Sequence, residues 1–319
     1  MKKVIGVDIG GTTSAVLLGT DGGKILDKIK FATGADRGPA FTLGKVYSSI
    51  ERLLERNQLS PGDMACIGVS CGGPLVSQEG LILSPPNLPG WDNVAIVENL
   101  ETRFNLDTYL ENDANASVLA EWRFGAGQGY NNLIFLTFGT GLGAGLILNG
   151  QLYRGTQDLA GEVGHIRLQE DGPRGYGKAG SFEGFCSGGG LVKLARLIIE
   201  EKKELGLEAE LIWKDSSRLT ARDIGLAADS GNQLAREILG VSGKYLGYGL
   251  AILVDIFNPE LIIIGSIYHR CRQYLEPPAR RVLNREALPR AWSQCCLKPS
   301  ALREEIGDYA SLAAALEHL

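Results

Sequence analysis

The chain opens with two apolar segments separated by small and polar residues. Residues 4–7 and 15–18 are apolar, whereas residues 8–14 read Asp-Ile-Gly-Gly-Thr-Thr-Ser. This pattern predicts a hairpin, because glycine adopts the positive φ angles that tight turns require. Residues 133–148 repeat the plan, with glycine and threonine again placed between two apolar runs. The repetition predicts two similar half-structures.

The rest of the chain alternates between strand and helix periods. An apolar stripe at helical spacing covers residues 43–54 and ends near Asn57. Four glycines interrupt a long helical run at 232–257, each costing about 1 kcal/mol relative to alanine, so we expect close helix packing there. The pattern also predicts buried strands at 65–70, 107–111 and 261–266. It predicts helices at 114–124, from a capping box of Thr220 and Asp223 through Ala228, and from Gly307. This alternation predicts an α/β protein.

Composition limits the classes of function. The chain has 319 residues, which favours two domains, and its 44% hydrophobic and 22% charged residues are typical of a soluble enzyme. A formal net charge of -5 argues against a nucleic-acid partner, which would require clustered basic residues. The basic run from Arg270 to Arg290 contains Glu276 and Glu286 and is interpreted as a solvated helix face.

Cysteine usage and apolar run lengths bear on location. The six cysteines lack C-x-x-C spacing and are interpreted as reduced thiols. Asp8 interrupts the first apolar run, so no signal peptide is expected, and no run reaches the roughly 20 apolar residues of a membrane span. We therefore expect a cytoplasmic protein without a membrane partner.

Each glycine turn can bind phosphate. Its backbone N–H groups converge on a concavity, and Thr12 and Thr13 add hydroxyl donors in the first turn. Asp8 repels phosphate but can hold a hydrated Mg²⁺ that bridges to it. A plain hairpin is the alternative for a single turn. Two such turns together suggest a nucleotide polyphosphate bound between two domains.

Polar residues near predicted strand ends are candidates for chemistry. Asn112 and Asp113 follow the strand at 107–111, where ligands bind in open α/β sheets. Either residue can serve as the helix N-cap, and one suffices, so the other is left free. An aspartate near two phosphate turns is a candidate general base. Asn87 lies in a proline-rich loop and is either a placed polar group or a turn former. His165 is either a binding residue or an ordinary satisfied histidine.

The two turns together resemble those of the sugar kinase, actin and heat-shock ATPase superfamily. The run Glu162-Val163-Gly164-His165, with the later Gly177, Gly180, Glu183 and Ser187-Gly188, resembles the ROK group of bacterial sugar kinases and sugar-responsive repressors. The resemblance extends from Ile5 to Ala315. It implies two actin-like (ribonuclease H-like) α/β domains with a cleft between them, and a homodimer. The implied domains are residues 1–112 with 306–319, and residues 113–305.

This chain departs from the family at its zinc motif. ROK proteins carry C-x-C-G-x-x-G-C-x-E after Glu-x-Gly-His, but here Arg174, Tyr176 and Ser181 stand in the cysteine positions. None of them supplies a thiolate for tetrahedral zinc, and His165 is the candidate ligand that is left. We therefore predict no structural zinc, and expect packing or hydrogen bonding to order residues 172–181.

The resemblance implies phosphorylation of a hexose or an N-acetylated hexosamine from Mg-ATP, usually at C6. Asp113 would accept the proton of the attacking hydroxyl. In the family the strand end at Gly265 lies against adenosine, and Ser266 replaces a second glycine. The implied sugar-binding residues are Gly73, Asn87, Asn112, Glu162, His165 and Glu183. The implied nucleotide-binding residues are Asp8, Gly10, Gly11, Thr12, Thr13, Gly139, Thr140, Gly141, Gly265 and Ser266.

Two other classes of function fit parts of the pattern. A sugar-responsive ROK repressor would carry a helix-turn-helix module ahead of the first hairpin, which here begins at Val4. A non-catalytic, ATP-binding actin-like protein would have no evident use for Asp113 or for residues 162–165. The sequence therefore favours a kinase, without naming its sugar.

Overall fold

The computed structural model describes residues 1–205 and 218–319. The chain divides into two compact α/β units. Unit 1 comprises residues 1–129, 145–160 and 304–319, and unit 2 comprises residues 130–144 and 161–303. Residues 113–129 belong to unit 1 because their helix packs against the C-terminal helix. The domain boundary predicted after residue 112 stays a prediction.

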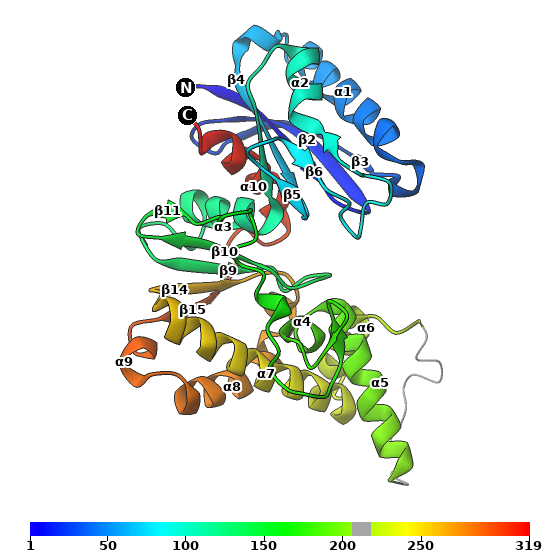
Figure 1. Ribbon diagram of the computed structural model, residues 1–319, viewed down its shortest axis with the longest axis vertical. Helices are drawn as coiled ribbons and strands as arrows, with labels where there is room; N and C mark the ends of the chain where they lie inside the picture. The colour runs from blue at the N-terminus through cyan, green and yellow to red at the C-terminus, as the bar shows by residue number, and fades with distance from the viewer. Residues whose placement is uncertain (206–217) are drawn as a thin grey trace. The chain divides into compact units, whose positions relative to one another are not determined.

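The main sheet of unit 1 has five strands in the order β3-β2-β1-β4-β8 (Figure 1). β1 pairs antiparallel with β2, as the predicted hairpin requires, and β2 pairs antiparallel with β3. β1 is parallel to β4, and β4 is parallel to β8. The strands are β1 (Lys3–Ile9), β2 (Thr13–Thr20), β3 (Ile25–Ala32), β4 (Met64–Cys71) and β8 (Thr108–Asn112).

Side chains alternate across the sheet of unit 1 and form two cores. Ile5, Val7 and Ile9 of β1 join the core beneath α1 (Pro39–Arg56) and α2 (Ile96–Phe104). Val4 joins the core beneath α10 (Ile306–Leu316), which lies beside α3 (Asp113–Phe124) in Figure 1. With helices on both faces, β1 and β4 are nearly continuous apolar strands.

Glycines let α10 approach the sheet closely. A Cβ added at Gly6 would lie 2.4 Å from Ser311 Oγ, and one at Gly68 would lie 2.3 Å from the backbone nitrogen of Ala315. A side chain at Gly68 would push the helix backbone away from the strands, and one at Gly6 would displace the Ser311 hydroxyl. The close approach places the first turn of α10 beside Asp8, whose Oδ2 would lie 2.6 Å from a Cβ at Gly307.

Short elements complete unit 1. β5 (Leu75–Val76), β6 (Leu81–Ile82) and β7 (Val94–Ala95) form an antiparallel sheet. The last residues of β10 (Ala144–Leu148) pair with β11 (Gln151–Leu152). A Cβ at Gly145 would lie 2.3 Å from the carbonyl oxygen of Ala114, so this hairpin packs tightly on the start of α3.

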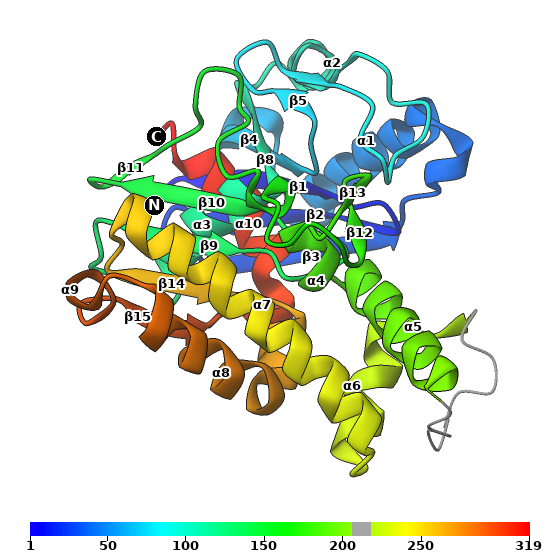
Figure 2. The same ribbon diagram turned by 60° about the horizontal axis from the view of Figure 1, so that its bottom comes forward.

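Unit 2 is built on three parallel strands covered by long helices. β14 (Leu261–Ile264) lies between β9 (Leu133–Leu136) and β15 (Cys296–Pro299). Figure 2 shows α7 (Gln233–Phe257) and α8 (Ile267–Glu286) side by side. The other elements are η3 (Val163–His165), β12 (Arg174–Gly175), β13 (Lys178–Ala179), α4 (Phe182–Phe185), α5 (Gly188–Glu204), α6 (Ala221–Asp229) and α9 (Pro289–Trp292).

The glycines of α7 confirm the predicted close packing. A Cβ at Gly243 would lie 2.4 Å from the carbonyl oxygen of Leu275, and one at Gly247 would lie 2.6 Å from that of Ala279. Among the described residues, α7 is the one helix that is long and apolar enough to cross a bilayer by length and composition. Most of its apolar positions are instead buried, and its neighbours include α8 and other helices of unit 2.

Candidate functional site

The β1–β2 turn of unit 1 holds the predicted Asp8, Gly10, Gly11, Thr12 and Thr13. The Thr33 hydroxyl donates a 2.6 Å hydrogen bond to the carbonyl oxygen of Gly10, and the Thr33 N–H donates to the carbonyl oxygen of Thr12 at 3.0 Å. These bonds fix the turn from the β3 side. Thr12 is exposed, whereas Gly10, Gly11 and Thr13 are partly buried.

Three predicted polar residues of unit 1 come together around the end of β4. A Cβ added at Gly72 would lie 3.7 Å from Asp113 Oδ2 and 3.8 Å from the side-chain oxygen and nitrogen of Asn87. One at Gly73 would lie 3.0 Å from the side-chain nitrogen of Asn112. Asn87 also lies against the β1–β2 turn, since a Cβ added at Gly11 would lie 2.8 Å from the Asn87 carbonyl oxygen. The structure therefore gathers these residues beside the first glycine turn.

The start of α3 resolves which residue caps the helix. Asn112 is the N-cap, and its Oδ1 accepts a 2.9 Å hydrogen bond from the N–H of Ala114. Asp113 is the first helical residue and is exposed. Its carboxylate thus stands at the positive end of the helix macrodipole.

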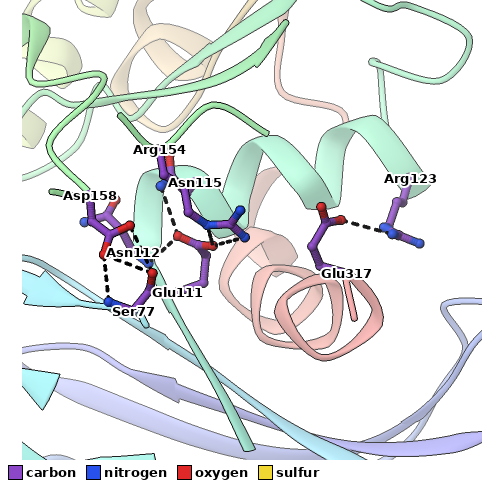
Figure 3. A network of polar contacts seen from close by, with 8 residues as sticks. All are labelled: Ser77, Glu111, Asn112, Asn115, Arg123, Arg154, Asp158 and Glu317. Carbon is purple, nitrogen blue, oxygen red and sulfur yellow. Dashed lines mark hydrogen bonds and ion pairs between the residues drawn. The ribbon is translucent and has the colours of Figure 1, made fainter. Parts of the chain in front are cut away.

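A buried carboxylate next to Asn112 is the centre of a polar network (Figure 3). Glu111 is 3% exposed and accepts hydrogen bonds from the N–H of Asn112 at 3.0 Å and from the side chain of Asn115 at 3.0 Å. Arg154 binds its other oxygen through Nε and a terminal nitrogen, each at 2.8 Å. Burial raises the pKa of Glu111, and the Arg154 guanidinium opposes that rise. The network fixes the last residue of β8 against the first turn of α3.

A second contact in Figure 3 ties the segment that contains Arg154 to the residue after β5, within unit 1. The Asp158 carboxylate accepts hydrogen bonds from the Ser77 N–H at 2.7 Å and from the Ser77 hydroxyl at 2.9 and 3.0 Å. Ser77 follows β5, the strand that begins two residues after Gly73. The segment at 154–158 therefore braces both the Gly73 loop and the Asn112–Asp113 corner.

The environment of Asp8 fits a cation. Its carboxyl is partly buried, and burial, reinforced by the nearby carboxylates of Asp308 and Asp113, raises its pKa to about 7. Lys28 opposes that rise, but it is also bound to Asp308 at 2.5 Å. A divalent cation would relieve this crowding of negative groups. Since Mg²⁺ usually keeps several waters and uses one or two carboxylates, Asp8 suits the predicted magnesium role.

The second turn, in unit 2, holds Gly139, Thr140 and Gly141. It is closed by hydrogen bonds from the N–H of Thr137 to the carbonyl oxygen of Gly143 at 3.0 Å and from the N–H of Gly139 to that of Gly141 at 3.1 Å. The Gly188 N–H at the start of α5 donates to the carbonyl oxygen of Gly139 at 2.8 Å. The turn is thus anchored to a long helix of its own unit.

Glu162, His165 and Glu183 lie close to the short β12–β13 hairpin. The Tyr176 hydroxyl donates to Glu162 at 2.7 Å, and the Tyr176 N–H donates to Glu183 at 3.3 Å. The Tyr176 ring stacks on the His165 imidazole with 5.5 Å between centroids. Glu183 also accepts a 3.2 Å bond from the N–H of Leu142 in the glycine turn. Unit 2 therefore brings its three predicted sugar-binding residues together.

Gly265 and Ser266 follow β14 in unit 2. The Gly265 N–H donates to the carbonyl oxygen of Leu136 at 2.9 Å, which continues the pairing with β9. Ser266 has φ 50° and ψ -111°, a conformation that favours glycine. The backbone therefore keeps the shape of the glycine that the family carries at this position.

Among the described residues, no group of three or more His, Cys, Asp or Glu side chains is arranged to hold a metal ion. At the zinc motif, Arg174, Tyr176 and Ser181 occupy the cysteine positions as ordinary hydrogen-bonding residues. These side chains do not fit a zinc ion that requires thiolates.

A sequence model of the ROK family matches residues 4–316. The chain belongs to the ROK family. The predicted actin-like α/β fold class is confirmed by the solved structures of ROK sugar kinases that it resembles.

ROK relatives include both kinases and repressors. A glucokinase of Halalkalibacterium halodurans is 32% identical, over 90% of this chain and 86% of that protein. A xylose repressor of Caldicellulosiruptor bescii is 29% identical, over 95% of this chain and 75% of the repressor. A crystal structure of a Streptomyces griseus ROK glucokinase, in complex with glucose and AMPPNP, is 30% identical, covers 98% of each chain and has a TM-score of 0.78. The kinase relatives support sugar phosphorylation as the activity.

Sequence reasoning missed the residues that hold the ROK site residues in place. Glu111 gave one available signal, because it is a charged residue inside a strand of the sheet. Tyr176 precedes Gly177 in a two-residue turn, a pattern typical of hairpins, but its flanking strands are only two residues each. Strands that short have no readable period.

Proposed function

We propose that this ROK protein transfers the γ-phosphoryl group of ATP to a hydroxyl of a hexose or N-acetylated hexosamine, at C6. The observation that carries the proposal is the gathering of Asp113, Asn87 and Asn112 beside the β1–β2 glycine turn of unit 1. A carboxylate, two amides and a phosphate-type turn are the groups that a sugar kinase requires on one side of its reaction. The glucokinase relatives support the same activity.

Asp113 is the proposed general base. Its exposed carboxylate accepts the proton of the sugar hydroxyl as that oxygen attacks the γ-phosphorus. Its position at the first residue of α3 is fixed by the Asn112 cap and by Glu111 behind it. Phosphoryl transfer demands mainly positioning and charge neutralisation, so a rigidly held base suits the reaction.

The proposed sugar-binding groups come from both units. Unit 1 supplies Gly73, Asn87 and Asn112, and unit 2 supplies Glu162, His165 and Glu183. Carboxylates, amides and an imidazole offer donors and acceptors in fixed directions, so a sugar that lacks a matching hydroxyl leaves one of them unpaired. The identity of the sugar follows from which hydroxyls these groups pair.

The proposed nucleotide-binding groups are the two glycine turns and the β14 end. Gly10, Gly11, Thr12 and Thr13 in unit 1 and Gly139, Thr140 and Gly141 in unit 2 would donate N–H and hydroxyl groups to phosphate oxygens. Asp8 would hold magnesium through water, and the ion supplies neutralisation of phosphate charge. Gly265 and Ser266 would lie against the adenosine. We also propose a cytoplasmic homodimer that binds no nucleic acid.

The second candidate is the sugar-binding body of a ROK regulator. The match to a xylose repressor over 95% of this chain supports this second candidate. Such a protein would bind a sugar without consuming ATP. The presence of Asp113 at the start of α3 supports the kinase instead, because ligand sensing has no need of a proton acceptor.

A sugar panel tests the proposal directly. Purified protein, Mg-ATP and single sugars, among them glucose, fructose, allose, mannose and their N-acetyl derivatives, are assayed for ADP release by a coupled enzyme reaction. We expect release that depends on one sugar or a small group of them, and a product phosphorylated at C6 by NMR. Sugar binding by calorimetry without sugar-dependent ADP release would favour the regulator and refute the kinase.

A further inference from the structure

The hairpin at 174–179 occupies the place of the zinc motif, and hydrogen bonds from neighbouring side chains hold it in place. Ser181 stands at a cysteine position and is fully buried. Its Oγ accepts hydrogen bonds from the N–H groups of Gly175 and Gly184 and donates to the carbonyl oxygen of Gly175, each at 3.1 Å. One hydroxyl thereby joins β12 to α4.

The hairpin lies directly on the segment that carries Glu183. A Cβ at Gly175 would lie 2.6 Å from the Gly184 nitrogen and 2.9 Å from the Cβ of Glu183. From α5, Lys193 donates a 2.6 Å hydrogen bond to the carbonyl oxygen of Arg174. Backbone contact and hydrogen bonds thus fix the base of the hairpin, so its tip can position other groups.

Tyr176 at the tip of the hairpin has a strained backbone. Tyr176 and Gly177 have φ of 51° and 69°, as in the two-residue turns that usually place asparagine or glycine first. A bulky residue in this conformation is unfavourable unless its side chain has a use that offsets the strain. The side chain of Tyr176 has that use, since its hydroxyl donates to Glu162 and its ring stacks on His165.

Lys178, on the other side of the turn, contacts the same histidine. Its ammonium lies 2.6 Å from His165 Nδ1 and 2.8 Å from the His165 carbonyl oxygen. An ammonium group can only donate, so Nδ1 accepts and the imidazole proton resides on Nε2. His165 is thereby set with a donor at Nε2.

We propose that Tyr176 and Lys178 are positioning residues that set Glu162, His165 and Glu183 for sugar binding, in a ROK protein that uses no structural zinc. The inference rests on the proposed function for its sugar, and on the hairpin contacts for its mechanism. The Tyr176 hydroxyl fixes Glu162, and its backbone N–H fixes Glu183. Lys178 fixes the orientation and the tautomer of the His165 imidazole. Ser181 holds the hairpin against α4, so that a thiolate-bound metal is not needed.

Kinetics of Tyr176→Phe and Lys178→Met test the positioning role. We expect each variant to raise the KM for the sugar roughly 3- to 10-fold, as expected for an exposed hydrogen bond to a charged or polar partner, with kcat and the KM for ATP within about twofold of wild type. Lys178→Arg should restore most of the affinity, because it keeps a charged donor. The matched control is Tyr274→Phe, which removes another tyrosine-to-carboxylate hydrogen bond, to Asp229, outside the candidate site.

The imidazole itself gives a readout that is independent of turnover. Long-range ¹H–¹⁵N spectra, with His165→Gln to assign the resonance among three histidines, should show the proton of His165 on Nε2 in wild type and a redistributed tautomer in Lys178→Met. If the protein phosphorylates no sugar in the panel, the proposed function fails while this spectrum still supports or overturns the role of Lys178. A proton on Nδ1 in wild type would overturn it.

Metal analysis tests the proposal that the protein uses no structural zinc. We expect purified protein to contain far less than one equivalent of zinc, and a chelator to leave sugar affinity and thermal unfolding unchanged. One tightly bound zinc per chain, with sugar affinity lost on chelation, would overturn the inference. So would Tyr176→Phe and Lys178→Met variants that both bind sugar as tightly as wild type.

Discussion

In unit 1 the candidate site residues stand at a strand end and a helix start, and the group behind them, Glu111, is a buried charge paired with Arg154. In unit 2 the corresponding residues Glu162 and His165 are exposed, and side chains of a small hairpin hold them. The first arrangement depends on core electrostatics, and the second on solvent-accessible hydrogen bonds. Substitutions in unit 1 should therefore affect chemistry and stability strongly, whereas those in unit 2 should mostly tune affinity.

The largest expected effect is loss of turnover in Asp113→Asn. An amide cannot accept the proton, so we expect kcat to fall about 10²- to 10⁴-fold, while calorimetry shows sugar and ATP binding close to wild type. Asp107→Asn, an exposed substitution just before β8, is the control and should retain turnover. Near-normal turnover in Asp113→Asn would show that another group is the base.

Next comes Arg154→Met, which leaves Glu111 buried without its cation. We expect the free energy of unfolding to fall by about 2–4 kcal/mol. Without Arg154 the pKa of Glu111 rises further above its unfolded value. Between those two pKa values the folded protein keeps a proton that the unfolded chain has released. Stability should therefore fall as pH rises, and the loss should be larger at pH 8 than at pH 5 in urea titrations.

A control on α3 sharpens this contrast. Arg123→Met breaks a 3.1 Å ion pair in which the Arg123 side chain is 33% exposed and the Glu317 side chain is 21% exposed. The free energy of unfolding should fall by less than about 1 kcal/mol. Equal losses in the two variants would mean that burial of Glu111 does not set the energetics of this corner.

A smaller effect is expected at Asp8. Because its pKa is raised to about 7, the folded protein binds a proton that the unfolded chain releases near pH 4, so stability without magnesium should fall by about 2–3 kcal/mol from pH 5 to pH 8. Asp8→Asn should remove most of this dependence and also raise the magnesium concentration that turnover requires. Magnesium should raise the melting temperature of wild type at pH 8 but not that of the variant. A flat wild-type profile would contradict the prediction.

The smallest effect is expected in unit 2, at Ser266. Ser266→Gly relieves a backbone with φ 50° and ψ -111° and should raise the free energy of unfolding by about 1 kcal/mol. Asn258→Gly is the matched control, because asparagine tolerates its left-handed φ 44° and ψ 55°, and should change little. A destabilised Ser266→Gly would show that the serine side chain, and not the backbone, matters here.

Local patterns in the sequence predicted the features that are formed by residues close together in the chain. The first hairpin, α3 and the Thr220–Asp223 capping box of α6 all follow from residues within a few positions of each other, and the structure has them. The sequence left open whether Asn112 or Asp113 caps α3, since both residues suit the position. The geometry of Asn112 decides it.

Long-range partners were beyond the reach of the sequence. Arg154 meets Glu111 across 43 positions of chain, and nothing local marks the pair. The roles of Tyr176 and Lys178 depend on which face of a tiny hairpin meets residues 162–165, which no periodicity encodes. The choice of catalytic residue, and the predicted domain boundary, rest on family resemblance and stay predictions.

The helix that closes the second core of unit 1 is made after unit 2. Because α10 follows every element of unit 2 along the chain, a ribosome finishes unit 2 while β1 and β4 still lack the helix that packs over Gly6 and Gly68. The nascent protein therefore carries an uncovered apolar sheet face through most of its synthesis. Its exposure to chaperones, and to mispairing with neighbouring chains, is set by how quickly the residues of α10 leave the exit tunnel.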